Sequence, residues 1–234
     1  HLDAVYRVFW YLKCSIKKKN YGRIVFDPSI PYVDEALFNA STRELWQDFY
    51  PDAEEAIPHD CPEPRGKYAV LACYVDADHA GNLVTRRSHT GIFLYINNTP
   101  IIFHSKRQNT VESASFGSEF IALKVATEMI QGLRYKLRMF GVPISGPTDV
   151  FCDNKSVVTN STIPTSMLNK KHNAICYHKV RESQAANMIR VGWILGEYNK
   201  ADILTKSTLS TGRRYDLMNT IFNLNCTVLS KSDN

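Results

Sequence analysis

The few cysteines of this sequence lack the spacings that are typical of zinc sites or disulfide frameworks. The 234 residues include six cysteines and no Cys-x-x-Cys pair, which argues against the common zinc modules and gives no basis for a disulfide framework. No apolar run is long enough to span a bilayer, and no secretory leader is recognisable. These absences predict a protein of a reducing compartment that does not span a membrane.

A nucleophilic serine or cysteine with a recognisable partner base is also missing, so nothing in the sequence indicates covalent catalysis.

Charge of one sign is not strongly in excess. The 28 basic and 23 acidic residues give a net charge of +5, and the pI is about 8.8. A mild positive excess is weak support for a polyanionic partner such as a nucleic acid.

Proline and the apolar pattern divide the chain into four segments. Residues 1–27 hold one helical pattern and one short strand, too little to bury a core alone, so we expect the end of a preceding domain. Residues 28–66 carry six of the ten prolines and are predicted to be a linker or insertion. The main domain is predicted at 67–208 and a C-terminal extension at 209–234. Because the sequence begins with His1, we expect a piece of a longer chain.

The main domain is predicted to be α/β. Three strands in succession predict an antiparallel meander, whereas two later strands reached across helices predict parallel additions. The expected fold is therefore a five-stranded mixed sheet with helices on its faces. The strands are predicted at 68–76, 91–97, 101–105, 148–152 and 189–197, and the helices at 115–140, 154–160, 171–186 and 201–205, with further helices at 35–49 and 213–222.

Four acids stand at the expected element ends. Asp76 ends the first strand, Glu119 lies near the start of the long helix, Asp153 follows the fourth strand, and Asp202 lies beyond the fifth. The carboxyl ends of parallel strands meet at one sheet edge, so these side chains are predicted to converge. Four adjacent carboxylates repel one another unless cations neutralise them, and oxygen-only ligands suit Mg²⁺ or Mn²⁺. The structural alternatives are a strand-end aspartate, a helix N-terminal acid, a helix cap and a surface acid.

Two such ions roughly 4 Å apart are the arrangement of metal-dependent nucleases. We predict two cation sites that share Asp76, with Glu119 and Asp153 on one ion and Asp202 on the other. The corresponding reaction is metal-assisted hydrolysis of a phosphodiester.

Six motifs in order give a more specific indication. They are YVDADHAG at Tyr74, SKRQNTV at Ser105, SEFIAL at Ser118, FCDNKSV at Phe151, KHNAICYHKVRE at Lys171 and ADILTK at Ala201. With these motifs the chain resembles the ribonuclease H domain of copia-type (pseudoviral) LTR retrotransposon Pol polyproteins. The opening HLDAVYRVFWYLK resembles the end of the reverse transcriptase that precedes this domain in the same polyproteins.

The resemblance implies a ribonuclease H-like fold and hydrolysis of the RNA strand of RNA–DNA hybrids during reverse transcription. It implies that Asp76, Glu119, Asp153 and Asp202 are catalytic and bind two Mg²⁺ or Mn²⁺ ions. The expected partners are the hybrid and the reverse transcriptase domain of the same polyprotein. The expected location is the cytoplasm within a virus-like particle, with the nucleus as the alternative.

Substrate contacts are predicted from position. Basic side chains that could contact phosphates are Arg86, Arg87, Lys106, Arg107, Lys170 and Lys171, for each of which simple solvation is the alternative. Gln108 and Asn154 are candidates for reading the 2′-hydroxyl that marks an RNA strand.

Two other functions stay open at this stage. A degenerate, non-catalytic copy would bind the hybrid or pack against the polymerase, and the intact set of four acids argues against it. An integrase-like nuclease of the same fold would end its acid set with a glutamate on a helix, which this chain does not. Cellular ribonucleases H place a histidine before the last aspartate, whereas residues 196–201 contain none.

Overall fold

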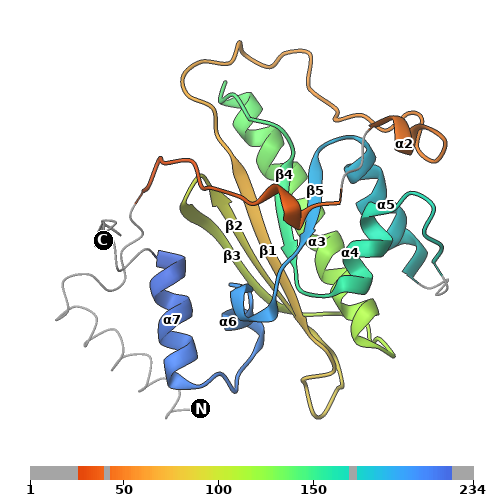
Figure 1. Cartoon of the computed structure of the whole chain (residues 1–234), viewed down its shortest axis with the longest axis vertical. Coiled ribbons are helices and arrows are strands. Elements are labelled where there is room, and N and C mark those ends of the chain that lie inside the picture. The colour runs from red at the N-terminus through yellow and green to blue at the C-terminus, as the bar shows by residue number, and fades with distance from the viewer. Residues whose placement is uncertain (1–25, 40–42, 169–172, 223–234) are drawn as a thin grey trace, which may run out of the picture.

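The computed structural model describes residues 26–39, 43–168 and 173–222. The segment predicted to end a preceding domain lies almost wholly outside the described residues, and so do Lys170, Lys171 and the end of the C-terminal extension. Along the described chain (Figure 1) the elements are η1 (Glu35–Leu37), α2 (Arg43–Gln47), β1 (Leu71–Asp78), β2 (His89–Ile96), β3 (Thr99–Arg107), α3 (Ser115–Met139), β4 (Thr148–Cys152), α4 (Lys155–Thr162), α5 (Ala174–Ala185), β5 (Ile189–Trp193), η3 (Gly196–Tyr198), α6 (Asp202–Thr205) and α7 (Thr211–Phe222).

The five strands form one mixed sheet in the order β3-β2-β1-β4-β5. The pairs β1–β2 and β2–β3 are antiparallel, and β1–β4 and β4–β5 are parallel. The tight connection between β2 and β3 places Asn97 at φ 53°, a left-handed conformation that asparagine tolerates in a hairpin turn. Helices α3 and α5 stand between the parallel strands in the sequence, as crossover connections require. The predicted five-stranded mixed sheet is confirmed.

Each face of the sheet carries its own core. On one face Val75, Ile92 and Val150 are buried against the long helix α3, with α4 and α5 beside it. On the other face Ala72, Phe93 and Phe151 pack with residues of α7 and of the segment around η1. Alternate residues of each strand therefore enter opposite cores, the period of two that strand geometry imposes. In Figure 1 the second face is turned toward the viewer, with α6 in front of the lower end of the sheet and α7 to the left of it.

Several predicted boundaries were wrong. The first strand does not end at Asp76 but continues to Asp78, because the antiparallel ladder with β2 extends as far as the pair Asp78–His89. The fifth strand ends at Trp193, where its ladder with Cys152 of β4 also ends. The single helix predicted at 35–49 is not formed. Among the residues of this range that the structure describes, only the short η1 and α2 are helical, and Phe38 between them is extended and forms a bridge to Gly192.

The segment predicted as a linker or insertion packs on the domain where it is described. Phe38 lies against Gly192, where a Cβ would sit 2.8 Å from the Phe38 ring. Trp46 is 2% exposed and shares a small core with Ala185. Glu55 accepts hydrogen bonds of 2.8 Å from Nε and Nη2 of Arg134 and of 2.6 Å from Nη2 of Arg138, both on α3. These contacts bind the segment to both sides of the domain.

Glu55→Ala should lower the free energy of unfolding by about 2–3 kcal/mol, because it leaves the buried Arg134 guanidinium without its counter-ion. Burial alone would raise the pKa of Glu55, but hydrogen bonds from Arg134 and Arg138 lower it to about 2. The contribution of Glu55 should therefore be present above pH 4.5 and be lost as the pH falls toward 2. Urea denaturation of Glu55→Ala and of the exposed control Glu128→Ala, which removes the surface pair with Lys124, measures both effects. Equal losses in the two variants would contradict the assignment.

Candidate metal centre

The parallel pairing of β1 with β4 sets the geometry of the acids. The last paired residues are Tyr74 and Phe151, and Asp76 and Asp153 each follow two residues later. Two residues restore the same side of a strand, so the two carboxylates lie beside each other at one edge of the sheet. Carboxylate oxygens of Asp76, Asp153 and Asp202 all lie within 4.8 Å of one another. The prediction that these three carboxylates lie close together is confirmed.

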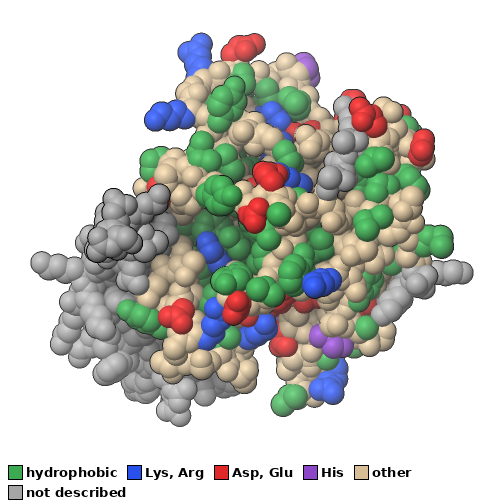
Figure 2. Space-filling model, viewed as in Figure 1, with side chains coloured by type: hydrophobic (Ala, Val, Ile, Leu, Met, Phe, Trp, Pro, Cys, Tyr) green, Lys and Arg blue, Asp and Glu red, His purple; other side chains and the backbone are tan. Residues whose placement is uncertain are grey.

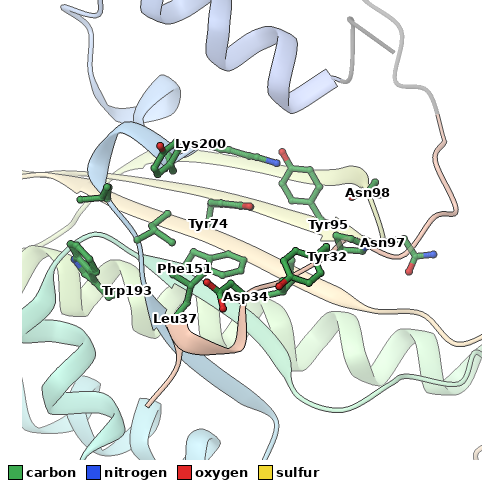
Figure 3. Close-up of a pocket in the computed structure, with 16 residues that line it drawn as sticks. Tyr32, Asp34, Leu37, Tyr74, Tyr95, Asn97, Asn98, Phe151, Trp193 and Lys200 are labelled. Carbon is green, nitrogen blue, oxygen red and sulfur yellow. The ribbon is translucent and has the colours of Figure 1, made fainter. Parts of the chain in front are cut away.

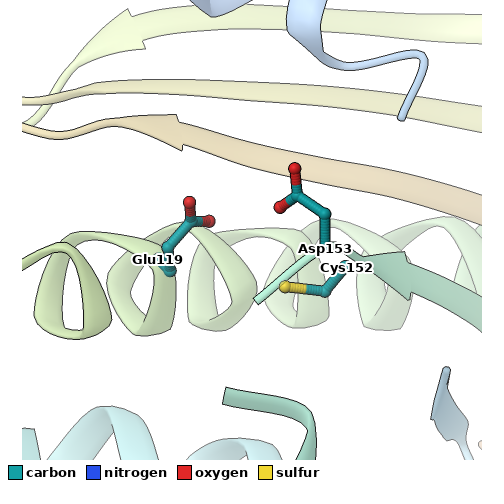
Figure 4. Close-up of side chains that lie close together, drawn as sticks. All are labelled: Glu119, Cys152 and Asp153. Atoms are coloured by element: carbon teal, nitrogen blue, oxygen red, sulfur yellow. The ribbon is translucent and has the colours of Figure 1, made fainter. Parts of the chain in front are cut away.

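Glu119 reaches the same place from the opposite face. It lies in the second turn of α3 and is 7% exposed. One oxygen of Glu119, one of Asp153 and the sulfur of Cys152 lie within 4.8 Å of one another, and Figure 4 shows both carboxylates directed toward the same side of α3. Asp153, not Asp76, is thus common to both groups of side chains, which differs from the predicted sharing. Cys152 is fully buried in the core under α3, and this burial raises the pKa of its thiol well above the usual value.

A short loop after β5 delivers Asp202. Asn199 is fully buried, and its side-chain nitrogen donates to the carbonyl of Val75 at 3.0 Å, while its oxygen accepts from the amide of Ala201 at 3.1 Å. Helix α6 then packs closely on β2 at Gly91, where a Cβ would lie 2.6 Å from Cγ2 of Thr205. The glycine is required because any side chain would displace α6 and Asp202 with it.

Three polar residues of this loop were missed by the sequence prediction: Asn199, Thr205 and Lys206. Thr205 Oγ1 donates a hydrogen bond to Asp76 Oδ2, and Lys206 Nζ lies 2.6 Å from Asp202 Oδ1. Helical spacing from Asp202 places positions 205 and 206 beside it, which is the sequence signal that was available for the last two. Asn199 carries no comparable signal.

Burial and neighbouring charges shift Glu119, Asp76 and Asp153 toward their neutral forms. Burial, and then the charges of Asp76 and Asp153, raise the pKa of Glu119 to about 9. Burial and the charge of Asp153 raise the pKa of Asp76 to about 6, although the hydrogen bond from Thr205 opposes this. Burial also raises the pKa of Asp153, against the opposing charge of Lys206. The carboxylates of the site, when ionised, carry more negative charge than the neighbouring basic side chains of the described residues neutralise.

These residues fit divalent cations. The donor set is oxygen-only once the Cys152 thiol is set aside, which suits Mg²⁺ or Mn²⁺. In addition, Glu119 Oε2 is buried and finds no hydrogen-bond partner within the described residues. A buried carboxylate oxygen without a partner is costly, and a cation held with Asp153 would remove that cost. The number and identity of the ions stay predictions.

The predicted substrate-contact residues have different surroundings. Lys106 and Arg107 are exposed at the end of β3. Arg86 and Arg87 lie in the connection from β1 to β2, with Arg86 exposed and Arg87 half-buried. Asn154 is the N-cap of α4, and its side-chain oxygen accepts from the amide of Val157.

That Gln108 reads a 2′-hydroxyl stays a prediction, although this residue is less accessible than its place in the sequence suggests. Gln108 is buried, and its side-chain nitrogen donates to Thr90 Oγ1 at 3.0 Å and to the carbonyl of Ser118 at 2.8 Å. It therefore ties the first turn of α3 to the sheet, one residue from Glu119.

The strand order and directions define the class: an α/β protein with a ribonuclease H-like sheet. Among solved structures the chain is similar to LC11-RNase H1, solved in complex with RNA/DNA hybrid, with 17% identity, 58% of this chain and 93% of that chain covered, and a TM-score of 0.47. It is also similar to a foamy viral protease-reverse transcriptase in complex with RNA/DNA hybrid, with 15% identity, 70% and 23% coverage, and a TM-score of 0.41.

Proteins that are similar in sequence give a more specific indication than the solved structures. The chain is 29% identical over 142 residues, 61% of its length, to the retrovirus-related Pol polyprotein from transposon RE2 of Arabidopsis thaliana. It is 30% identical over 147 residues, 63% of its length, to that from transposon TNT 1-94 of Nicotiana tabacum. These matches confirm the resemblance to retrotransposon Pol polyproteins. The chain covers 10% and 11% of the two polyproteins, and no protein-family model matches it. No helix among the described residues is long and apolar enough to cross a membrane.

The raised pKa values predict an unusual pH dependence in metal-free protein. Glu119 retains its proton in the folded state up to a pH of about 9 but loses it near 4.5 when unfolded. Protonation therefore favours the folded state, and this stabilisation should be lost as the pH rises from about 4.5 to 9. Glu119→Gln should raise the free energy of unfolding at pH 8 by about 1–3 kcal/mol in the presence of a chelator.

Denaturation at several pH values, with Glu128→Gln of the same helix as control, measures this difference. Added Mn²⁺ should remove the advantage of the Gln variant. The assignment would be wrong if the two variants had the same pH dependence.

Proposed function

We propose that this chain is the ribonuclease H domain of a retrotransposon Pol polyprotein and that it hydrolyses the RNA strand of RNA–DNA hybrids with two divalent cations. The observation that carries the proposal is the convergence of Asp76, Glu119, Asp153 and Asp202 at one edge of the sheet. The Pol polyprotein relatives support it. We also propose that it acts beside the reverse transcriptase domain of the same polyprotein, in the cytoplasm within a virus-like particle.

The chain's own residues would hold and orient the reacting groups. Asp76, Asp153 and Asp202 would bind one cation, and Glu119 with Asp153 another. When bound, such ions activate a water molecule and stabilise the leaving oxygen. Thr205 fixes the Asp76 carboxylate by donating to Oδ2, which leaves Oδ1 for a ligand. Without a general-base histidine in residues 196–201, proton transfer falls to the acids and to solvent.

A non-catalytic module is the second candidate, and one contact favours it. The Lys206 ammonium lies 2.6 Å from Asp202 Oδ1. Burial lowers the pKa of Lys206, but its hydrogen bond to Asp202 and the charges of Asp76 and Asp153 outweigh this and raise it. A lysine thus supplies part of the positive charge that the acids need, so the cluster is partly neutralised without metal. Such a module would bind the hybrid and leave it uncut.

Asp153→Asn separates the two functions. Asparagine keeps the shape of the side chain but removes the carboxylate that both groups of ligands share. For a metal-dependent nuclease, cleavage of the RNA strand should fall by at least about a hundredfold, which is about 2.7 kcal/mol of transition-state stabilisation. Hybrid binding should persist or tighten, because a negative charge near the phosphates is gone.

The assay uses a labelled RNA–DNA duplex with Mg²⁺ or Mn²⁺, beside the same duplex with chelator. Asp216→Asn, an exposed acid on α7, is the matched control and should cut normally. If the unaltered protein binds the duplex but never cuts it in either metal, the nuclease proposal fails and the binding module replaces it.

Hybrid binding should also depend on the basic end of β3. Lys106 and Arg107 are exposed there, and side chains that contact phosphates release counter-ions from the nucleic acid. The Lys106→Ala/Arg107→Ala double variant should reduce the slope of log affinity against log salt by about 1–2.

A matched control is the Lys67→Ala/Lys136→Ala double variant, which removes the same charge from exposed positions. Lys136 lies in the last turn of α3, about 25 Å along the helix from Glu119 at 1.5 Å per residue. Salt titrations of Asp153→Asn carrying either pair measure the slopes without cleavage. Equal slopes would remove Lys106 and Arg107 from the contact surface.

A further inference from the structure

A cavity of about 390 Å³ lies on the face of the sheet opposite α3, between the strands and the segment around η1. Six of its sixteen lining residues are aromatic, namely Tyr32, Tyr74, Tyr95, Phe151, Trp193 and Tyr198. Figure 3 shows Tyr32, Tyr74, Tyr95 and Phe151 around a common space, with Trp193 toward one end, and Figure 2 shows hydrophobic side chains gathered on this face of the molecule. A cavity of this size and lining is typical of sites for small molecules rather than for nucleic acid backbones.

One cation enters this aromatic cavity. Lys200 Nζ lies 4.8 Å from the centroid of the Tyr74 ring and 4.6 Å from that of Tyr95. No carboxylate of the described residues lies within ion-pair distance of this ammonium group. Asp34, which also lines the cavity, uses Oδ1 to accept from the amide of Ala36.

A second polar group in the cavity wall is also without a partner. Tyr95 is 3% exposed, and its hydroxyl finds no hydrogen-bond partner within the described residues. Figure 3 shows this hydroxyl beside the ammonium end of Lys200. A buried hydroxyl normally has a hydrogen-bond partner, and leaving it without one is costly. An uncompensated cation and an unsatisfied donor next to each other match a ligand that brings one anionic group.

We infer that this cavity binds a small planar aromatic molecule carrying a single anionic group, with the anion on Lys200 and the Tyr95 hydroxyl and the ring among Tyr74, Phe151 and Trp193. The sheet supplies a flat apolar floor, and offset or edge-on ring contacts favour a planar ligand. None of the four acids of the candidate metal centre lines the cavity. The inference therefore does not depend on the nuclease proposal.

The cavity and the acids are nevertheless adjacent. Tyr74, Phe151 and Lys200 each precede an acid of the cluster by two residues, namely Asp76, Asp153 and Asp202. Trp193 Nε1 also donates to the backbone carbonyl of Asp153 at 3.0 Å. A ligand on these rings would thus contact the same strand ends that position the carboxylates.

The test uses two fluorescent probes with the same ring system: 8-anilinonaphthalene-1-sulfonate and the uncharged N-phenyl-1-naphthylamine. The full chain should bind the sulfonate with Kd values that rise about tenfold or more in Lys200→Met, since a charge-assisted contact is lost. Methionine keeps the apolar stem on the two tyrosine rings, so binding of the uncharged probe should change by less than twofold. Tyr95→Phe should weaken sulfonate binding several-fold without lowering the thermal unfolding temperature, because its hydroxyl has no partner to lose.

The matched control is Lys155→Met. Lys155 Nζ also lies over an aromatic ring, 4.2 Å from the centroid of Trp193, but it does not line the cavity and should leave sulfonate binding unchanged. Asp153→Asn should bind the sulfonate like the unaltered protein, which keeps this result separate from that for the nuclease. Absence of sulfonate binding, equal losses for both probes in Lys200→Met, or the same loss in Lys155→Met would overturn the inference.

Discussion

The parallel pairing of β1 with β4 is the contact on which the rest of the molecule depends. Because Tyr74 pairs with Phe151, Asp76 and Asp153 come to lie side by side, although both carboxylates would be more stable apart. The apolar residues of β1 and β4 that precede the two acids hold this arrangement. Val75 and Val150 are fully buried under α3, and each such side chain contributes about 1.5–3 kcal/mol. A handful of these contacts outweighs the repulsion of the acids, so packing on one face maintains electrostatic strain at the sheet edge.

How far the sequence predicts the fold depends on whether local signals are sufficient. The prediction for β4 at 148–152 was confirmed, because a short apolar run there is bounded on both sides. The start of α3 at Ser115 was also confirmed, and Gly141, at φ 70°, follows its end. The end of β1 was wrong, since the additional ladder pairs come from β2, whose register is not visible locally. The helix predicted at 35–49 failed for the same reason: the contact of Phe38 with Gly192 spans most of the chain.

The candidate site shows the same division. The acids could be found because each lies inside a recognisable motif near the end of a predicted element, and the structure brings them together. The residues that surround and position the acids could not be predicted from the sequence. Gln108 was predicted only as a possible 2′-hydroxyl contact, and its hydrogen bonds to Thr90 and Ser118 were not foreseen. Asn199 has no local signal, although its bond to the carbonyl of Val75 holds the loop that carries Asp202. Such contacts depend on the packing of distant elements, which a single sequence does not encode in any short pattern.

The period of two along a strand links the acid cluster to the aromatic cavity. Tyr74 and Asp76 must face the same side of β1, and Phe151 and Asp153 the same side of the chain at β4. The residues that floor the cavity therefore cannot move without moving the carboxylates next to them. The loop after β5 repeats the relation, because Lys200 enters the cavity while Asn199 is bonded to β1 and Asp202 reaches the acids. A sheet face that must place three acids within 4.8 Å of one another thus also fixes the two aromatic residues and the lysine that precede them by two positions. The geometry of each site therefore constrains that of the other.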